Sequence, residues 1–78
     1  MTAPTPPRVS LDSTTLAATA YDDRRGELQL DFRDGTRYLY SGVTADLYRD
    51  LLCATSKGSF FNRYIRSHFS YAKLSPEN

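Results

Sequence analysis

The sequence predicts an α+β fold in which a three-stranded antiparallel meander is followed by two short helices packed on one face. Apolar and polar residues alternate from Glu27 to Phe32 and again after the next turn, a pattern typical of half-buried strands. The intervening loops are too short for parallel crossovers, so neighbouring strands run antiparallel. After Thr44 the apolar spacing changes to three and four residues, which indicates helices.

The first predicted strand covers residues 16–21 and is followed by a polar turn that ends in Gly26. Residues 8–13 precede this strand and contain two apolar side chains in alternation. We therefore expect an extended arm whose Val9 and Leu11 contact the sheet.

The turn between the second and third strands allows two registers that place two tyrosines on opposite faces. A two-residue loop of Asp34 and Gly35 would turn Tyr38 and Tyr40 to the polar face, as an exposed platform suited to base stacking. A three-residue loop that adds Arg33, with Gly35 left-handed, shifts the register by one residue and reverses the faces. This second register gathers one apolar face from Leu28, Leu30, Phe32, Tyr38 and Tyr40. We favour it and predict that Gly35 forms the turn and that both tyrosine rings are mainly buried.

The third strand is predicted over residues 36–41, and a helix capped by Thr44 follows it to about Ala54. Asp46 lies in the first turn of this helix, where a negative side chain interacts favourably with the helix dipole. The buried stripe consists of Leu47, Leu51 and either Tyr48 or Leu52.

A second helix is predicted to be capped by Ser59 or a neighbour and to continue to about His68. Its apolar residues recur every four positions, at Phe61, Ile65 and Phe69. The following residues, 70–74, are expected to form a short extended piece that packs back through Tyr71 and Leu74.

Length and composition predict one domain, which we place at residues 9–74. Residues 1–8 contain three of the four prolines and are assigned to a flexible tail, and residues 75–78 to a frayed C-terminus. The tail has neither the basic start nor the apolar run of a signal peptide. With no apolar segment long enough to span a bilayer, we expect a cytoplasmic protein without membrane contact.

Charge is balanced overall but unevenly distributed. The chain carries +1, yet residues 1–46 hold five basic and seven acidic side chains, whereas residues 47–78 hold five basic and two acidic ones. The C-terminal half is therefore the basic one, and the whole chain exerts no strong field on nucleic acid or membranes.

The sequence offers little for catalysis or metal binding. Cys53 is the single cysteine and His68 the single histidine, so no cysteine cluster and no evident nucleophile–base pair exists. The paired carboxylates Asp22 and Asp23 lack further ligands nearby in the sequence. We expect no enzyme activity, no cofactor and no metal.

The candidate binding residues are Lys57, Gly58, Ser59, Arg63 and Arg66. Free amides at a helix start, a glycine that permits close approach, and a lysine together suit a phosphate group. The two arginines, with Arg49 as a further cation, would extend this into a small footprint on a nucleic-acid backbone. The alternative is that these residues bind no ligand, the turn only caps the helix, and the arginines are solvated.

These features together resemble the KTSC domain family, named for a segment at the C-terminus of some lysyl-tRNA synthetases. The resemblance rests on Tyr21-Asp22, the run 28–32, Gly35–Tyr40 with its Tyr38 and Tyr40, Val43, and the run 54–66. It covers about residues 11–74, and small stand-alone bacterial members look similar. The family has no established activity, and the synthetase connection implies RNA, of the tRNA type, as a partner.

Two functions follow as hypotheses. In the first, the chain is an RNA-binding module with weak, salt-sensitive affinity for phosphates. In the second, it is a protein-interaction module that offers a sheet edge or the Arg37–Leu39 face to a partner.

Overall fold

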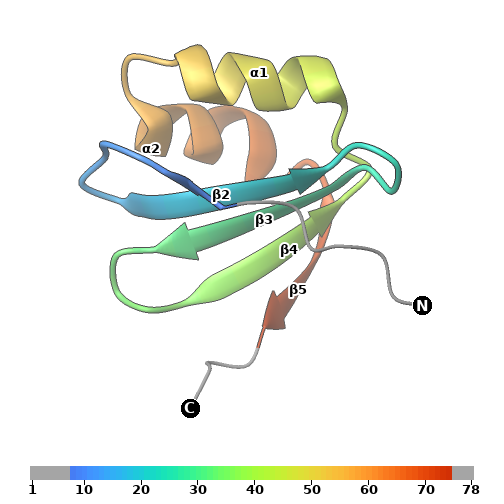
Figure 1. Ribbon diagram of the computed structural model, residues 1–78, viewed down its shortest axis with the longest axis horizontal. Coiled ribbons are helices and arrows are strands. Elements are labelled where there is room, and N and C mark those ends of the chain that lie inside the picture. The colour runs from blue at the N-terminus through green and yellow to red at the C-terminus, as the bar shows by residue number, and fades with distance from the viewer. Residues whose placement is uncertain (1–7, 75–78) are drawn as a thin grey trace.

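A computed structural model describes residues 8–74 as one antiparallel sheet with its helices on one face (Figure 1). The predicted tails at residues 1–7 and 75–78 lie outside the described residues. The strands follow one another across the sheet in chain order, β1-β2-β3-β4-β5. The elements are β1 (Val9–Ser10), β2 (Leu16–Asp22), β3 (Glu27–Phe32), β4 (Arg37–Ser41), α1 (Ala45–Cys53), α2 (Lys57–Phe60), η1 (Phe61–Ile65) and β5 (Ser70–Leu74).

The α+β class and the antiparallel meander are confirmed, but the sheet has five strands where we predicted three. The expected N-terminal arm pairs with β2 as the short strand β1, and the C-terminal extended piece pairs with β4 as β5. All residues of these two strands except Leu74 are exposed, so the strands bury little apolar surface of their own. Arg8, which we assigned to the flexible tail, forms an ion pair with Asp31 (Nη2 to Oδ2 2.9 Å).

The β3–β4 turn has the predicted three-residue loop. Leu28 lies opposite Tyr40 and Leu30 opposite Tyr38, so both rings share the apolar face of the hairpin. The Phe32 N–H donates to the Thr36 carbonyl at 2.8 Å. Gly35 has a φ of +93°, a backbone conformation that disfavours any side chain with a Cβ. Tyr40 is buried as predicted, whereas Tyr38 is half-buried.

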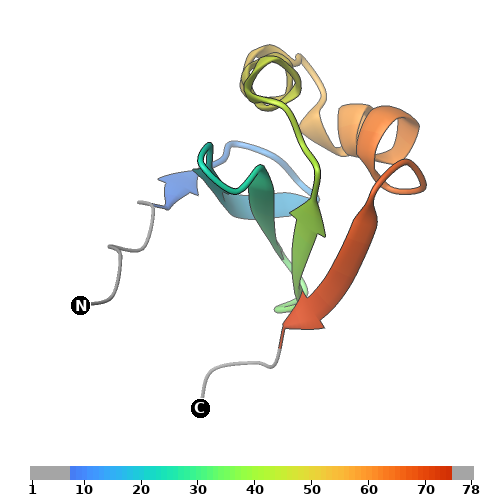
Figure 2. The ribbon, with the colours of Figure 1, turned by 90° about the vertical axis from the view of Figure 1, so that its right-hand side faces the viewer.

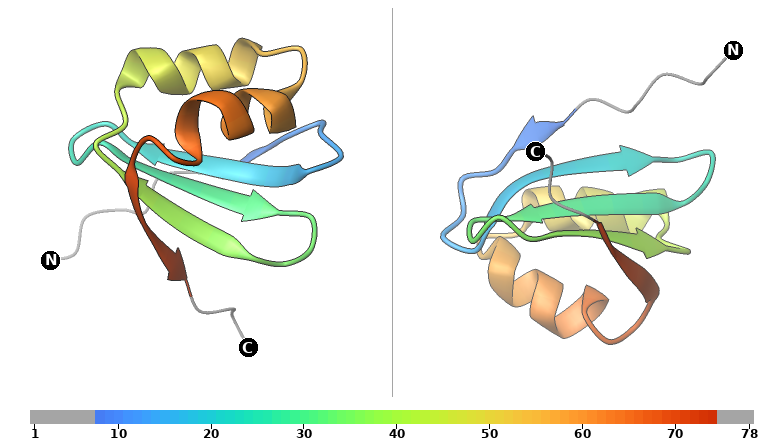
Figure 3. Two further views of the ribbon diagram at one scale, coloured as in Figure 1. Left: turned by 180° about the vertical axis from the view of Figure 1, so that it is seen from behind. Right: turned by 90° about the horizontal axis from the view of Figure 1, so that it is seen from below.

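The helices cover the face of the sheet that carries this apolar row, and the opposite face is left uncovered by them (Figures 2 and 3). Between the layers lies one core, formed by Leu11, Leu16, Leu28, Leu30, Tyr40, Val43, Leu51, Phe61 and Ile65. The Tyr21 hydroxyl donates to the Val43 carbonyl at 2.7 Å, and its ring stacks on Tyr48 at 4.7 Å between centroids. This contact ties the end of β2 to the start of α1.

Helix α1 begins as predicted, because the Thr44 hydroxyl accepts the Leu47 N–H at 3.2 Å. Of its predicted stripe, Leu51 is fully buried and Leu47, Tyr48 and Leu52 are half-buried. The second helix differs from the prediction. Its cap is Ser56, so it starts at Lys57, and it ends at Ile65 after one π-helical turn, η1.

Candidate functional site

A groove of about 600 Å³ lies between η1 and the helix-facing side of β4 and β5. Six of its lining residues are aromatic, and the volume falls within the range of about 300–1,000 Å³ for ligand sites. The groove is lined by Thr15, Phe32, Asp34, Thr36, Tyr38, Tyr40, Phe61, Asn62, Arg66, Ser67, Phe69 and Tyr71.

Strand pairing brings the tyrosines of this groove together. Tyr71 of β5 lies opposite Tyr40 of β4, and its neighbour on the same face, Lys73, lies opposite Tyr38. The Tyr71 ring stands 5.6 Å from each of the two β4 rings, measured between centroids. Tyr40 is only 3% exposed and forms the floor, whereas Tyr71 is 59% exposed and forms an accessible wall.

The π-helical turn sets the other wall of the groove. The Arg66 N–H donates to the Phe61 carbonyl at 2.9 Å, five residues back, and Phe61 and Ile65 point into the core. On the groove side, Arg66 Nη1 lies 3.5 Å from Asn62 Oδ1. Asn62 and Arg66 therefore present an amide and a guanidinium beside the aromatic rings.

The groove has a positive side chain at one end and a negative side chain at the other. Arg66 comes from the end of η1, close to where β5 begins, whereas Asp34 belongs to the hairpin at the other end of β4. Hydrogen bonds from the Thr36 hydroxyl and N–H hold the pKa of Asp34 below its usual value, with Lys73 adding to this effect. Burial, followed by Tyr38 and Tyr71, raises the pKa of Tyr40, and Arg66 opposes that rise. The floor of the groove is therefore a neutral phenol at physiological pH.

Three of the predicted site residues line a second hollow, of about 410 Å³, and each has a role in the fold. Lys57 Nζ donates to the Ala54 carbonyl at 3.0 Å, and the Ser59 N–H donates to the Ser56 hydroxyl at 3.4 Å. A Cβ on Gly58 would meet the Thr15 hydroxyl at 2.9 Å. Lys57, Gly58 and Ser59 thus close the junction between α1, α2 and the chain before β2.

The two predicted arginines differ in their surroundings. Arg66 lines the groove, whereas the Arg63 guanidinium lies over the Tyr64 ring, 5.7 Å from its centroid, outside the groove lining. The Arg63 carbonyl lies 3.0 Å from His68 Nε2. Because a carbonyl oxygen only accepts, that ring nitrogen carries the proton.

Sequence reasoning did not assign a site role to Tyr71, Lys73 or Phe69. The alternation of the segment 70–74 does place Tyr71 and Lys73 on one side of a strand. It does not show that this strand pairs with β4, which follows only from long-range packing.

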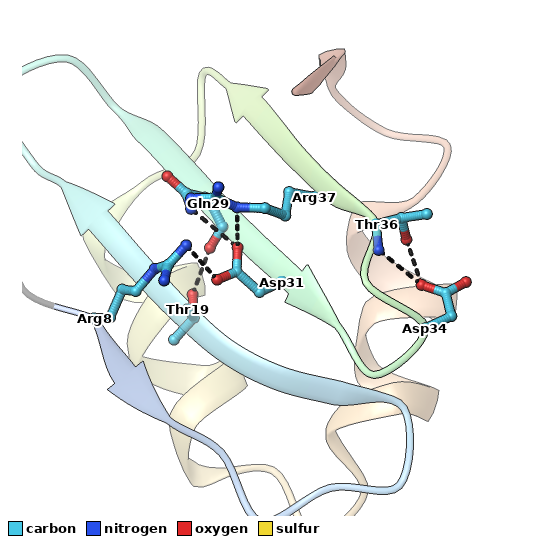
Figure 4. Close-up of polar contacts among 7 residues, drawn as sticks. All are labelled: Arg8, Thr19, Gln29, Asp31, Asp34, Thr36 and Arg37. Carbon is cyan, nitrogen blue, oxygen red and sulfur yellow. Dashed lines mark hydrogen bonds and ion pairs between the residues drawn. The ribbon is translucent and has the colours of Figure 1, made fainter. Parts of the chain in front are cut away.

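The uncovered face of the sheet carries a polar cluster centred on Asp31 (Figure 4). Asp31 pairs with Arg8 at 2.9 Å and with Arg37 at 3.4 Å, and accepts the Gln29 side-chain N–H at 2.9 Å. These contacts pair the Asp31 carboxylate with two cations of the same molecule. Leu39 and Leu74, which belong to neighbouring strands, are half-buried.

Within residues 8–74, no group of three or more His, Cys, Asp or Glu side chains could hold a metal ion. No helix among the same residues is long and apolar enough to cross a membrane. Cys53 is an exposed free thiol at the end of α1.

A protein-family model, the KTSC domain, matches residues 12–69. A crystal structure of a KTSC domain protein from Yersinia pestis superimposes with a TM-score of 0.86 at 29% identity, and covers 88% of this chain and 97% of that one. An uncharacterised protein from Stutzerimonas stutzeri is 32% identical over 86% of this chain and 96% of its own length.

A lysine–tRNA ligase from Nostoc punctiforme is 29% identical over 88% of this chain. The match spans only 12% of that ligase. The same sequence unit is thus found both in short proteins and as one segment of a much longer enzyme.

Proposed function

The chain belongs to the KTSC domain family, and from this premise we propose that it is a small non-catalytic module that binds the phosphate backbone of RNA. The similarity to a segment of a lysine–tRNA ligase supports RNA as the partner, since that enzyme's name includes tRNA. In this proposal the module works in the cytoplasm, needs neither metal nor cofactor, and binds weakly and in a salt-sensitive manner.

The observation that carries the proposal is that Arg63 and Arg66 are exposed and have no carboxylate partner among the described residues. By contrast, Arg8, Arg25 and Arg49 each have a carboxylate partner. Two exposed arginines without a carboxylate partner on one short segment are available for phosphates, which guanidinium groups bind through paired N–H donors.

The second hollow extends this cationic surface. It shares Thr15 and Asn62 with the aromatic groove, so the two hollows adjoin. Lys57 Nζ donates to the Ala54 carbonyl, and Ser56 and Ser59 line the same hollow. A backbone that follows both hollows would meet Lys57 and then Arg66, with Gly58 and Ser59 at the entrance.

The non-catalytic part of the proposal rests on the groups that line the hollows. They offer tyrosines, hydroxyls, an amide, carboxylates and cations, but neither His68 nor Cys53 is among them. A hydrolytic or transfer reaction needs a nucleophile with a base in reach or a metal. Binding is the chemistry that these side chains support.

The first prediction concerns charge reversal. Fluorescence anisotropy with a labelled single-stranded oligouridine and a labelled RNA hairpin should show that R63E/R66E abolishes binding. If Lys57, Arg63 and Arg66 each neutralise one phosphate of a single strand, the logarithm of the association constant should fall with the logarithm of salt at a slope of about −2. A rise from about 50 to about 200 mM salt should then weaken wild-type binding roughly 16-fold.

The matched control is R24E/R25E, which makes the same change in net charge at the β2–β3 turn, outside both hollows. It should retain RNA affinity within about twofold at moderate salt, because exposed charges more than a Debye length from the RNA are largely screened. Equal losses in both double variants would show a general charge effect and contradict the assignment of the site.

A protein-interaction role is the second candidate, and the uncovered sheet face favours it. The helices leave this face open, and β5 ends the described sheet with one unpaired edge (Figure 3). If the wild type shows no RNA affinity even at low salt, this candidate replaces the first. Salt-tolerant self-association in sedimentation equilibrium would then support it.

A further inference from the structure

We propose that the aromatic groove holds one unpaired base of a single-stranded RNA, stacked on Tyr71, with an adjoining phosphate at Arg66. This inference rests on the proposed function and deepens it. It assigns a base-binding role to residues outside the predicted phosphate footprint. It also selects single-stranded over duplex RNA, in which the bases are already stacked.

The first argument is the accessibility of the Tyr71 ring. Tyr38 meets Tyr71 edge-on, at 71° between ring planes, and Tyr40 lies tilted below it at 36°. These contacts fix one side of the ring, while 59% of the residue stays exposed. A base is a flat aromatic group that can cover such a face, and base–aromatic stacking is a common means of binding single strands.

The second argument is the order of charges along the groove. Arg66 lines the groove near the start of β5, and Asp34 lines it at the hairpin end. Lys73 lies on the same face of β5 as Tyr71 but outside the lining, where it acts on Asp34. The cation of the groove itself is therefore Arg66, and a nucleotide has the complementary pattern, since its aromatic base is joined through the sugar to an anionic phosphate.

Asp34 limits the kind of ligand that fits. It lines the hairpin end of the groove as a carboxylate, and Thr36 donates two hydrogen bonds to its Oδ1, at 3.0 and 2.7 Å. A compact polyanion that filled the groove would approach this charge. A strand whose phosphate lies at Arg66 places an uncharged base in the rest of the groove.

The test compares tyrosine variants in titrations of a fluorescein-labelled single-stranded oligouridine at about 50 mM salt. We expect Y71A to weaken binding about tenfold or more, and Y71F to bind within about twofold of wild type, because phenylalanine keeps the stacking face. The slope of affinity against salt should stay the same in Y71A, since the phosphate contacts remain. The control is Y64A, which removes another exposed tyrosine that lies outside the groove.

The outcomes separate this inference from the proposed function. If R63E/R66E abolishes binding while Y71A binds like wild type, the RNA is held by its backbone alone, and the stacking role is wrong. A loss in Y64A as large as that in Y71A would equally overturn the role of the groove. If wild type binds no RNA at all, the proposed function itself fails. Circular dichroism melts of each variant show whether the fold is retained.

Discussion

At the residue scale, Asp34 and Thr36 show how two hydrogen bonds lower the pKa of a carboxyl group at the hairpin end of the groove (Figure 4). The Thr36 hydroxyl and N–H both donate to Asp34 Oδ1, at 2.7 and 3.0 Å. Hydrogen bonds to the ionised form lower the pKa of a carboxyl group. Asp34 therefore stays charged at a lower pH than an ordinary aspartate, and repels phosphates from this end of the groove.

The corresponding prediction is that T36V raises the pKa of Asp34 toward its usual value of 3.8. A carboxyl whose pKa is lowered by folding adds stability above its unfolded-state pKa, and this contribution is lost as the pH falls through the folded-state pKa. The stability difference between wild type and T36V should thus be largest above about pH 4 and decrease in acid. A carbon-13 NMR titration of the Asp34 carboxyl measures the shift directly. An unchanged titration curve in T36V would contradict the assigned cause.

At the element scale, the start of the second helix shows why Gly58 is present. A Cβ at this position would lie 2.9 Å from the Thr15 hydroxyl oxygen and 3.1 Å from the Thr15 Cβ. Close approach of α2 to the chain before β2 therefore explains the glycine without a ligand. The sequence alone could not separate this packing role from the phosphate role that we assigned to Gly58, because both require a residue without a side chain.

We predict that G58A lowers the free energy of unfolding by about 1–2 kcal/mol, since extra atoms in a packed contact force neighbours to move. Helix propensity alone would predict the opposite, because alanine is favoured over glycine by roughly 0.5–1 kcal/mol in a helix. Guanidinium chloride denaturation of wild type and G58A decides between the two. Adding T15A should recover part of the loss, since it removes the closest contact. A more stable G58A would show that Thr15 moves aside at no cost.

The elements with strong local signals were predictable, and those fixed by distant partners were not. The alternation of apolar and polar residues and the Asp-Gly turn predicted β3, β4 and their register. Thr44 predicted the start of α1. Strands β1 and β5 are recognisable only from their pairing with β2 and β4. The π-helical turn was not predictable, because Phe61 and Ile65 are four residues apart and ordinary helical spacing already places both on one buried face.

At the scale of the whole molecule, the groove exists because β5, which follows the helices in the chain, pairs with β4, which precedes them. Tyr38 and Tyr71 are separated by the two helices in sequence, yet their ring centroids are 5.6 Å apart. Arg66 ends the helical segment that leads into β5. From the sequence, the tyrosines were assigned to packing roles, Tyr38 in the core and Tyr71 in an extended piece that packs back, and Arg66 to a phosphate footprint. The structure places both at one groove, because β5 closes on β4 directly after η1.

The central claim is that this groove, and not the uncovered sheet face, is the binding surface for RNA. The most direct test is nitrogen-15 NMR of the whole chain during titration with a single-stranded oligouridine at low salt. We expect the largest shift changes in the backbone amide signals of Asn62, Arg66 and Tyr71 and in the side-chain signals of Asn62 and Arg66. The signals of Gln29, Asp31 and Leu39, on the uncovered face, should stay in place. Shifts confined to that face, or no shifts at saturating RNA, would contradict the account.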